Sequence, residues 1–215
     1  VDAGDYFQGT LFFNAWRGSD AVMALNTIGY DVATLGNHEF DLGPEGLAAA
    51  MRGDAVEIAG VGYTTESIDL PIVVTNLDYT AEPELAGASW LQDSVVFERG
   101  GRRFGVLGII TDTTSNIASP GPNIQFLDYV STVQGEVDRL EAEGVNHIIL
   151  LSHIGHANDI NLATALQGVD VIVSGHDHRL VGDAAASAAD PLTADFADDV
   201  AGPYPSRVTG ADNDP

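Results

Sequence analysis

The sequence predicts a layered α/β fold, and two features of the 215-residue chain support this prediction. Segments with strand and helix patterns alternate along the chain, which is typical of sheets covered by helices. Apolar runs such as residues 148–151 lack the two-residue alternation of a half-exposed strand, so both faces of these strands should be covered. The length is sufficient for a sizeable core, and we expect residues 1–215 to form a single domain.

Capping residues locate the first two predicted helices. Ser19-Asp20 offers an N-cap to a helix over residues 21–28, and Gly29 is suited to end that helix. Pro44 stands near the first turn of another predicted helix, over residues 44–51. Helical spacing of apolar residues predicts a helix over residues 129–143, and a further helix is predicted over residues 159–166.

Six apolar segments bounded by turn or polar residues are predicted strands. The two segments that flank Gly100-Gly101 should form a hairpin, because consecutive glycines permit a tight turn between strands. The predicted strands cover residues 31–35, 72–77, 95–98, 104–110, 146–152 and 170–174.

The chain is strongly acidic, with 32 acidic residues, 8 basic residues and a formal net charge of −24. This excess indicates a hydrated surface suited to high salt, where screening tolerates self-repulsion, and an acidic secreted protein is the alternative. Nucleic-acid binding through basic patches is not expected. The absence of cysteine excludes disulfides and thiolate metal sites. No apolar run reaches the ~18 residues that a membrane-spanning helix needs.

Four short clusters place metal-ligating residue types after predicted strands, and the last three clusters hold five of the 6 histidines. Because strand ends meet in one crevice of an α/β sheet, residues far apart in sequence should converge there. Asp, Asn and His without Cys favour divalent cations that activate water. The four clusters are Gly4-Asp5, residues 36–41 (Gly-Asn-His-Glu-Phe-Asp), residues 152–156 (Ser-His-Ile-Gly-His) and residues 175–178 (Gly-His-Asp-His).

The first two clusters suggest roles for individual side chains. Asn37 can supply a neutral oxygen ligand, and His38, oriented by Asp41, can donate a proton to a leaving oxygen. The alternative for this cluster is an Asx-type turn with a surface histidine. For Asp5, the alternative to a metal ligand is a turn or helix-cap residue.

The other histidines divide into candidate ligands and supporting or structural residues. After the strand that ends at Ser152, we favour His153 as a ligand and His156 as its supporting residue. The spacing of His176 and His178 lets both rings face one pocket, although a coincidental surface pair is the alternative. A surface or structural role is expected for the remaining histidine, at position 147.

The order of these clusters resembles the calcineurin-like metallophosphoesterase superfamily. The Phe40-Asp41 extension, the segment Thr75-Asn76-Leu77 and residues 152–156 resemble the 5′-nucleotidase family, more narrowly its N-terminal metallophosphatase domain. The resemblance covers essentially the whole chain. It implies a layered sandwich of two central mixed β-sheets flanked by helices. It also implies hydrolysis of nucleotides or related phosphate esters, in a periplasmic, secreted or cell-surface location.

The resemblance further implies two divalent metal ions that activate water for attack on phosphorus. Their identity stays open among Zn, Mn, Fe, Co and Ca. His38 and Asp41 would form the catalytic dyad. The implied metal ligands are Asp5 as the bridge between the ions, Asn37, His153 and His176 at one site, and His178 at the other.

One departure from the family pattern concerns the start of the chain. The family carries an Asp-x-His pair on a strand upstream of the Gly-Asp element, and no such pair precedes Gly4-Asp5. We therefore expect a domain that is incomplete at both termini, a weakened second metal site, poor activity and no nucleotide-specificity domain. Residues 184–199 read as a loop that leads towards a further strand.

Two alternatives to a nucleotide hydrolase stay open from the sequence. The first is a non-catalytic metal-binding protein that retains the fold. The second is a hydrolase of the same fold that acts on cyclic nucleotides, nucleotide sugars or thiosulfate esters.

Overall fold

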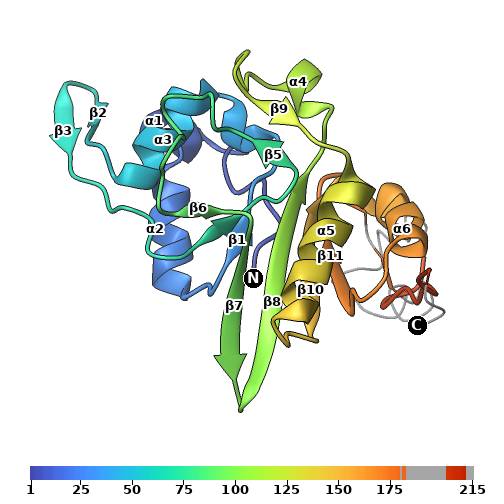
Figure 1. Cartoon of the computed structure of the whole chain (residues 1–215). Helices are drawn as coiled ribbons and strands as arrows, with labels where there is room; N and C mark the ends of the chain where they lie inside the picture. The colour runs from blue at the N-terminus through green and yellow to red at the C-terminus, as the bar shows by residue number, and fades with distance from the viewer. Residues whose placement is uncertain (180, 183–201, 212–215) are drawn as a thin grey trace.

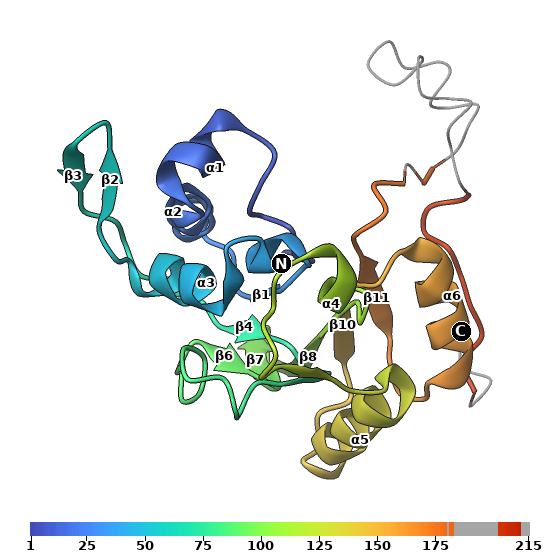
Figure 2. The same cartoon turned by 90° about the horizontal axis from the view of Figure 1, so that it is seen from above.

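The computed structural model describes residues 1–179, 181–182 and 202–211. Two β-sheets lie at the centre, and helices cover their outer sides (Figures 1 and 2). The predicted layered α/β fold is confirmed. The segment 184–199, which we expected to lead towards a further strand, lies outside the described residues. In the described ranges, no helix has the length and apolar character needed to cross a bilayer.

The first sheet consists of β1 (Ala33–Thr34), β4 (Ile72–Val73) and β6 (Leu91–Gln92). These strands are parallel and lie in the order β1-β4-β6. They share one apolar core with the helices on their outer side. Those helices are α1 (Leu11–Trp16), α2 (Ser19–Ile28) and α3 (Gly43–Arg52).

The second sheet is mixed and has the strand order β11-β10-β8-β7, in which only β7 is antiparallel to its neighbour. Helices α5 and α6 cover its outer face and close a second apolar core (Figure 2). The elements are β7 (Ser94–Arg99), β8 (Arg102–Ile110), α5 (Tyr129–Ala142), β10 (Ile148–His153), α6 (His156–Ala165) and β11 (Val171–Ser174).

The two sheets pack face to face through apolar side chains. Val32, Val73, Val106 and Leu151 form the cluster between them. At the closest approach, a Cβ on Gly108 would overlap the carbonyl oxygen of Val73, so only glycine permits this spacing. The predicted covering of both strand faces holds for β10, whose residues are buried or nearly so. The edge strand β11 is partly exposed.

Several short elements were not predicted, because two to six residues carry too little periodicity to be recognised. In addition to α1 and β6, they are the 3-10 helix η1 (His38–Phe40), the hairpin of β2 (Val56–Ile58) and β3 (Val61–Tyr63), the pair of β5 (Leu77–Asp78) and β9 (Gln125–Phe126), and α4 (Thr114–Ile117).

The predicted strand over residues 72–77 divides after Val73. The backbone N–H of Thr75 donates to the carbonyl of Gly108 at 2.6 Å. The side chain of Asn76 bonds both the N–H and the carbonyl of Ile110, each at 2.9 Å. These bonds carry the chain from the first sheet to β8, so the segment cannot continue as one strand.

Two helices begin two to three residues earlier than predicted. The helix predicted from residue 21 begins at Ser19, with Gly18 as N-cap, and Ser19 is buried inside it. The helix predicted from residue 159 begins at His156, because the buried Asp159 accepts a hydrogen bond from Ser152 and does not cap the helix. The predicted hairpin at Gly100-Gly101 is confirmed.

Candidate metal centre

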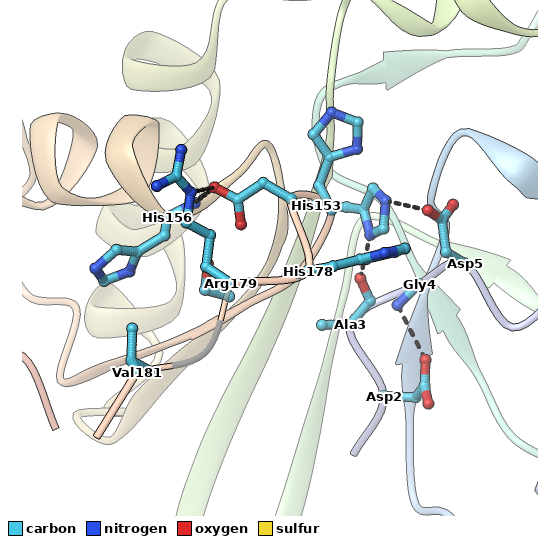
Figure 3. Close-up of a pocket in the computed structure, with 13 residues that line it drawn as sticks. Asp2, Ala3, Gly4, Asp5, His153, His156, His178, Arg179 and Val181 are labelled. Atoms are coloured by element: carbon cyan, nitrogen blue, oxygen red, sulfur yellow. Dashed lines mark hydrogen bonds and ion pairs between the residues drawn. The ribbon is translucent and has the colours of Figure 1, made fainter. Parts of the chain in front are cut away.

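Three of the predicted ligands lie together at the ends of the central strands. Asp5, His153 and His176 each place a ligand atom within 4.8 Å of the others, and we call them the inner group. His153 Nε2 lies 2.9 Å from Asp5 Oδ2. The group lines a cavity of about 340 Å³ (Figure 3). The sequence predicted that residues 5, 37, 153, 176 and 178 converge, and this group brings together residues 5, 153 and 176.

The parallel strands β10 and β11 account for the position of the two histidines. Ser152 of β10 pairs in register with Ser174 of β11, so the residues that follow both strands emerge side by side. The rings of His153 and His176 lie 5.1 Å apart between centroids, at an interplanar angle of 64°. Strand register thus brings together two residues that are far apart in sequence.

A backbone contact orients the ring of His153. Its Nδ1 donates to the carbonyl oxygen of Ala3 at 2.7 Å, which leaves Nε2 directed towards Asp5 (Figure 3). Metal-binding histidines commonly donate their other ring nitrogen to a carbonyl in this way. The Ala3 carbonyl was not identified from the sequence, because a backbone acceptor has no residue-type signal.

Burial and neighbouring groups together shift the pKa values of the inner group. Burial opposes ionisation of Asp5, but His153 and the N–H of His38 outweigh it and hold the pKa of Asp5 below its ordinary value. Burial also opposes the charged form of His153, yet contact with Asp5 raises the pKa of His153. For His176, burial together with the neighbouring His153 lowers the pKa, which favours the neutral ring that binds metal.

The backbone is strained at the predicted ligands. Six non-glycine residues in the described ranges have positive φ, and Asp5, His176 and His178 are three of them, at 63°, 85° and 51°. Such conformations are costly for L-residues and concentrate at functional sites. The strain therefore marks three of the five positions that the sequence motifs indicated as ligands.

Among the residues that the structure describes, the buried atoms Asn37 Oδ1 and His176 Nδ1 find no hydrogen-bond partner. Unpaired buried polar atoms are rare in native proteins. Asn37 stands at the start of η1 but makes no side-chain capping bond, which argues against the Asx-type turn considered above. Carboxylate, amide and imidazole groups form a set that fits a divalent metal ion.

The remaining predicted site residues are more exposed, and we call His38, Asp41 and His178 the outer group. His38 Nδ1 lies 2.8 Å from Asp41 Oδ2, as the predicted dyad requires. The backbone N–H of His38 donates to Asp5 Oδ1 at 2.9 Å, which joins the dyad to the inner group. His178 lines the cavity but is not a member of the three-residue group.

Two further side chains at the site were not identified from the sequence. Glu39 is fully buried and accepts three backbone hydrogen bonds. Gln8 Nε2 donates to Asp41 Oδ2 at 2.8 Å. The only signal for Glu39 was its place inside the second cluster, and Gln8 carried none.

The other two histidines lie apart from the inner group. His156 lines the cavity, and its backbone N–H donates to Asp177 Oδ2 at 3.2 Å. Asp177 also forms an ion pair with Arg179 at 3.4 Å (Figure 3). His147 stacks on Phe104 at 5.2 Å, in agreement with the structural role expected for it.

Carboxylate, imidazole and amide groups at the strand ends of a layered α/β fold are typical of metal-dependent hydrolases. Residues 1–180 match the calcineurin-like phosphoesterase family, and the chain belongs to this family. The family predicted from the four clusters is confirmed. Members of this family use divalent metal ions.

Nucleotidases are prominent among the relatives of this chain. It is 34% identical over 214 residues to the 5′-nucleotidase of Diplobatis ommata, covering 99% of this chain and 33% of that protein. It is 37% identical over 184 residues to a probable 5′-nucleotidase of Treponema pallidum, covering 85% of this chain and 28% of that protein.

A solved structure with the same arrangement is the 5′-nucleotidase precursor from Thermus thermophilus. It matches with a TM-score of 0.83 and 38% identity, over 99% of this chain and 37% of that chain. The chain thus spans about a third of the length of these relatives.

Proposed function

We propose that this protein hydrolyses phosphate esters of nucleotides or closely related compounds, with the help of divalent metal ions. The observation that carries the proposal is the inner group, because it gathers a carboxylate and two imidazoles from distant segments within 4.8 Å. Relatives named as 5′-nucleotidases support the substrate class. We also propose that residues 1–215 belong to a single phosphoesterase domain.

The proposed ligands follow the sequence prediction. We assign Asp5, Asn37, His153 and His176 to one metal position, and Asp5 with His178 to a second, weaker position. When bound, the cations supply charge that polarises phosphoryl oxygens and lowers the pKa of water. They also offset the repulsion between an anionic substrate and a chain of net charge −24. The metal identity stays open among Zn, Mn, Fe, Co and Ca.

His38 is proposed to act on the leaving group. Because Nδ1 contacts Asp41, the opposite ring nitrogen is free to donate a hydrogen bond or proton to a substrate oxygen. The side chain of His38 is 40% exposed, so a substrate can reach it. Asp41 would hold the ring in the orientation that this role requires.

The acidic composition and the family support two proposals about the environment. The excess of 32 acidic over 8 basic residues suits a surface that works at high salt. A periplasmic, secreted or cell-surface location is proposed from the family resemblance. Activity that rises with salt concentration would support the first proposal, and fractionation of native cells would test the second.

The direct test is phosphate release from a nucleoside 5′-monophosphate in the presence of Mn²⁺ or Zn²⁺. We expect His38→Ala to lower kcat by about 10²- to 10⁴-fold, the usual contribution of a positioned general acid. His147→Ala is the matched control, because His147 stacks on Phe104. Equal activity of His38→Ala and the wild type would contradict the proposed role of the dyad.

A substrate panel separates the proposal from its alternatives. Cyclic nucleotides, nucleotide sugars and thiosulfate esters are assayed beside the monophosphate under the same conditions. Preferential hydrolysis of one of these would favour the same-fold alternative. Metal binding without release of product from any substrate would favour the non-catalytic one.

A further inference from the structure

Glu39 lies beneath the inner group, and nothing in the proposed catalytic assignments uses it. Its side chain is 0% exposed, which is rare for a glutamate. It belongs to the short helix η1, between the proposed catalytic His38 and the core residue Phe40. Its carboxylate therefore faces the interior of the protein.

Both oxygens of this carboxylate are engaged by backbone donors. Glu39 Oε2 accepts from the N–H of Asp5 at 2.9 Å and from the N–H of Gly36 at 2.6 Å. Glu39 Oε1 accepts from the N–H of Phe7 at 2.8 Å. Asp5 and Phe7 are 34 and 32 residues away in the sequence. One side chain thus joins the segment 5–7 to the turn at Gly36.

The segment that Glu39 holds is conformationally strained. Asp5 has φ of 63°, in the left-handed region that only a few per cent of non-glycine residues adopt. Such a conformation persists only where the surroundings determine it. The turn at Gly36 leaves no freedom either, because a Cβ there would overlap Asp5 Oδ1. The position of the Asp5 carboxylate therefore depends on the hydrogen bonds to its backbone.

We infer that Glu39 is a positioning residue, which holds the backbone of Asp5 so that the Asp5 carboxylate stays within the inner group. This inference rests on the proposed function, because it assumes that Asp5 binds metal. Glu39 itself is not a ligand, since both its oxygens accept backbone hydrogen bonds and it is absent from the three-residue group. It also cannot contact a substrate from its fully buried position.

The test uses two variants and one control. Glu39→Gln keeps the size of the side chain but replaces one acceptor oxygen with an NH₂ group. That group then faces either the N–H of Phe7 or the N–H groups of Asp5 and Gly36, and cannot accept from them. Glu39→Asp keeps the charge but is one methylene shorter, so its carboxylate cannot reach both segments at once. Glu57→Gln is the control, because Glu57 is exposed on β2.

Two readouts that require no turnover are measured. Calorimetric titration with Mn²⁺ should show an affinity about 10- to 100-fold weaker in both Glu39 variants, as for other residues that orient metal ligands. Hydrogen exchange of the metal-free protein should be about tenfold faster at the amides of Asp5, Phe7 and Gly36, because charge-assisted bonds have been lost. Neither value should change in the control.

Three outcomes would overturn the inference. The first is wild-type Mn²⁺ affinity in the folded Glu39→Gln variant, even if its unfolding free energy has fallen, since that would show a structural role alone. The second is wild-type Mn²⁺ affinity in folded Glu39→Asp. The third is rapid exchange of the three amides in the wild-type protein, which decides the matter even if neither variant folds. Failure of the wild type to release phosphate would contradict the proposed function but not these results.

Discussion

The inner and outer groups of the site differ in how firmly the protein holds them. In the inner group, the side chains of His153 and Asp5 are 1% and 11% exposed, and backbone contacts fix both residues. In the outer group, His38 is 40% exposed and His178 is exposed at the cavity. The inner group therefore forms a rigid wall of the site, and the outer group forms an accessible wall.

This difference separates two tasks that one site has to perform. The rigid wall has its geometry before any ligand binds, because strand ends and backbone hydrogen bonds determine that geometry. The accessible wall is held mainly by contacts between side chains, such as His38 with Asp41. We therefore expect metal affinity to depend on the rigid wall, and turnover to depend on the accessible wall.

The largest effect should come from removing a ligand of the inner group. We expect His153→Ala to weaken Mn²⁺ binding by more than about 100-fold, because loss of a ligand should exceed the loss of a residue that only orients one. His178→Ala should weaken it by about tenfold at most. Calorimetric titration of the folded variants measures both values.

The ratio of the losses in Mn²⁺ affinity in these two variants tests whether the rigid wall binds metal more strongly than the accessible wall. His147→Ala serves as the control, since His147 lies outside the cavity lining. Equal losses for His153→Ala and His178→Ala would show that both walls contribute equally to metal binding.

A smaller effect is expected when the dyad of His38 and Asp41 is disrupted, and it should appear in kcat. Asp41→Asn removes the carboxylate partner of His38 Nδ1 and should lower kcat about 10- to 100-fold, less than the loss expected when His38 itself is removed. The Mn²⁺ affinity should stay unchanged. Steady-state kinetics and titration of the same preparation separate the two quantities. A parallel fall in Mn²⁺ affinity would place Asp41 in the rigid wall.

Asp159 tests how strongly the rigid wall excludes water. It is 4% exposed and bonds Ser152, the residue before His153. Burial raises the pKa of Asp159 above its ordinary value of 3.8, so its stabilising contribution is present below that value and is lost as pH rises through the raised pKa. Asp159→Asn should therefore gain unfolding free energy relative to the wild type as the pH rises from 4 to 7.

Urea denaturation at the two pH values measures this difference, with the exposed Asp69→Asn as control. A difference that does not change with pH would mean that Asp159 is better solvated than its burial indicates.

The smallest effect is expected at Gln8. Its hydrogen bond to Asp41 lies in the exposed part of the site, so Gln8→Ala should lower kcat only about two- to fivefold. The same phosphate-release assay measures this change. A loss as large as that of Asp41→Asn would show that the outer group depends on Gln8 for its orientation.

Much of the fold could be predicted because its signals are local. The hairpin at Gly100-Gly101 and the helix over residues 129–143 follow from turn chemistry and helical spacing, and the structure contains both. The strand over residues 72–77 was predicted as continuous, yet it divides because Asn76 bonds Ile110 of the second sheet. No local pattern reports such a contact.

The same distinction applies to the site. By itself, the sequence determined which ligand types follow which strands, because Asp5, His153 and His176 each stand directly after a turn or strand signal. Only the tertiary structure decided which of the candidates meet, how the Ala3 carbonyl orients His153, and that Glu39 is buried beneath Asp5. The physical reason is that strand register and long-range hydrogen bonds join residues from opposite ends of the chain, and these partners exist only once both sheets have packed together.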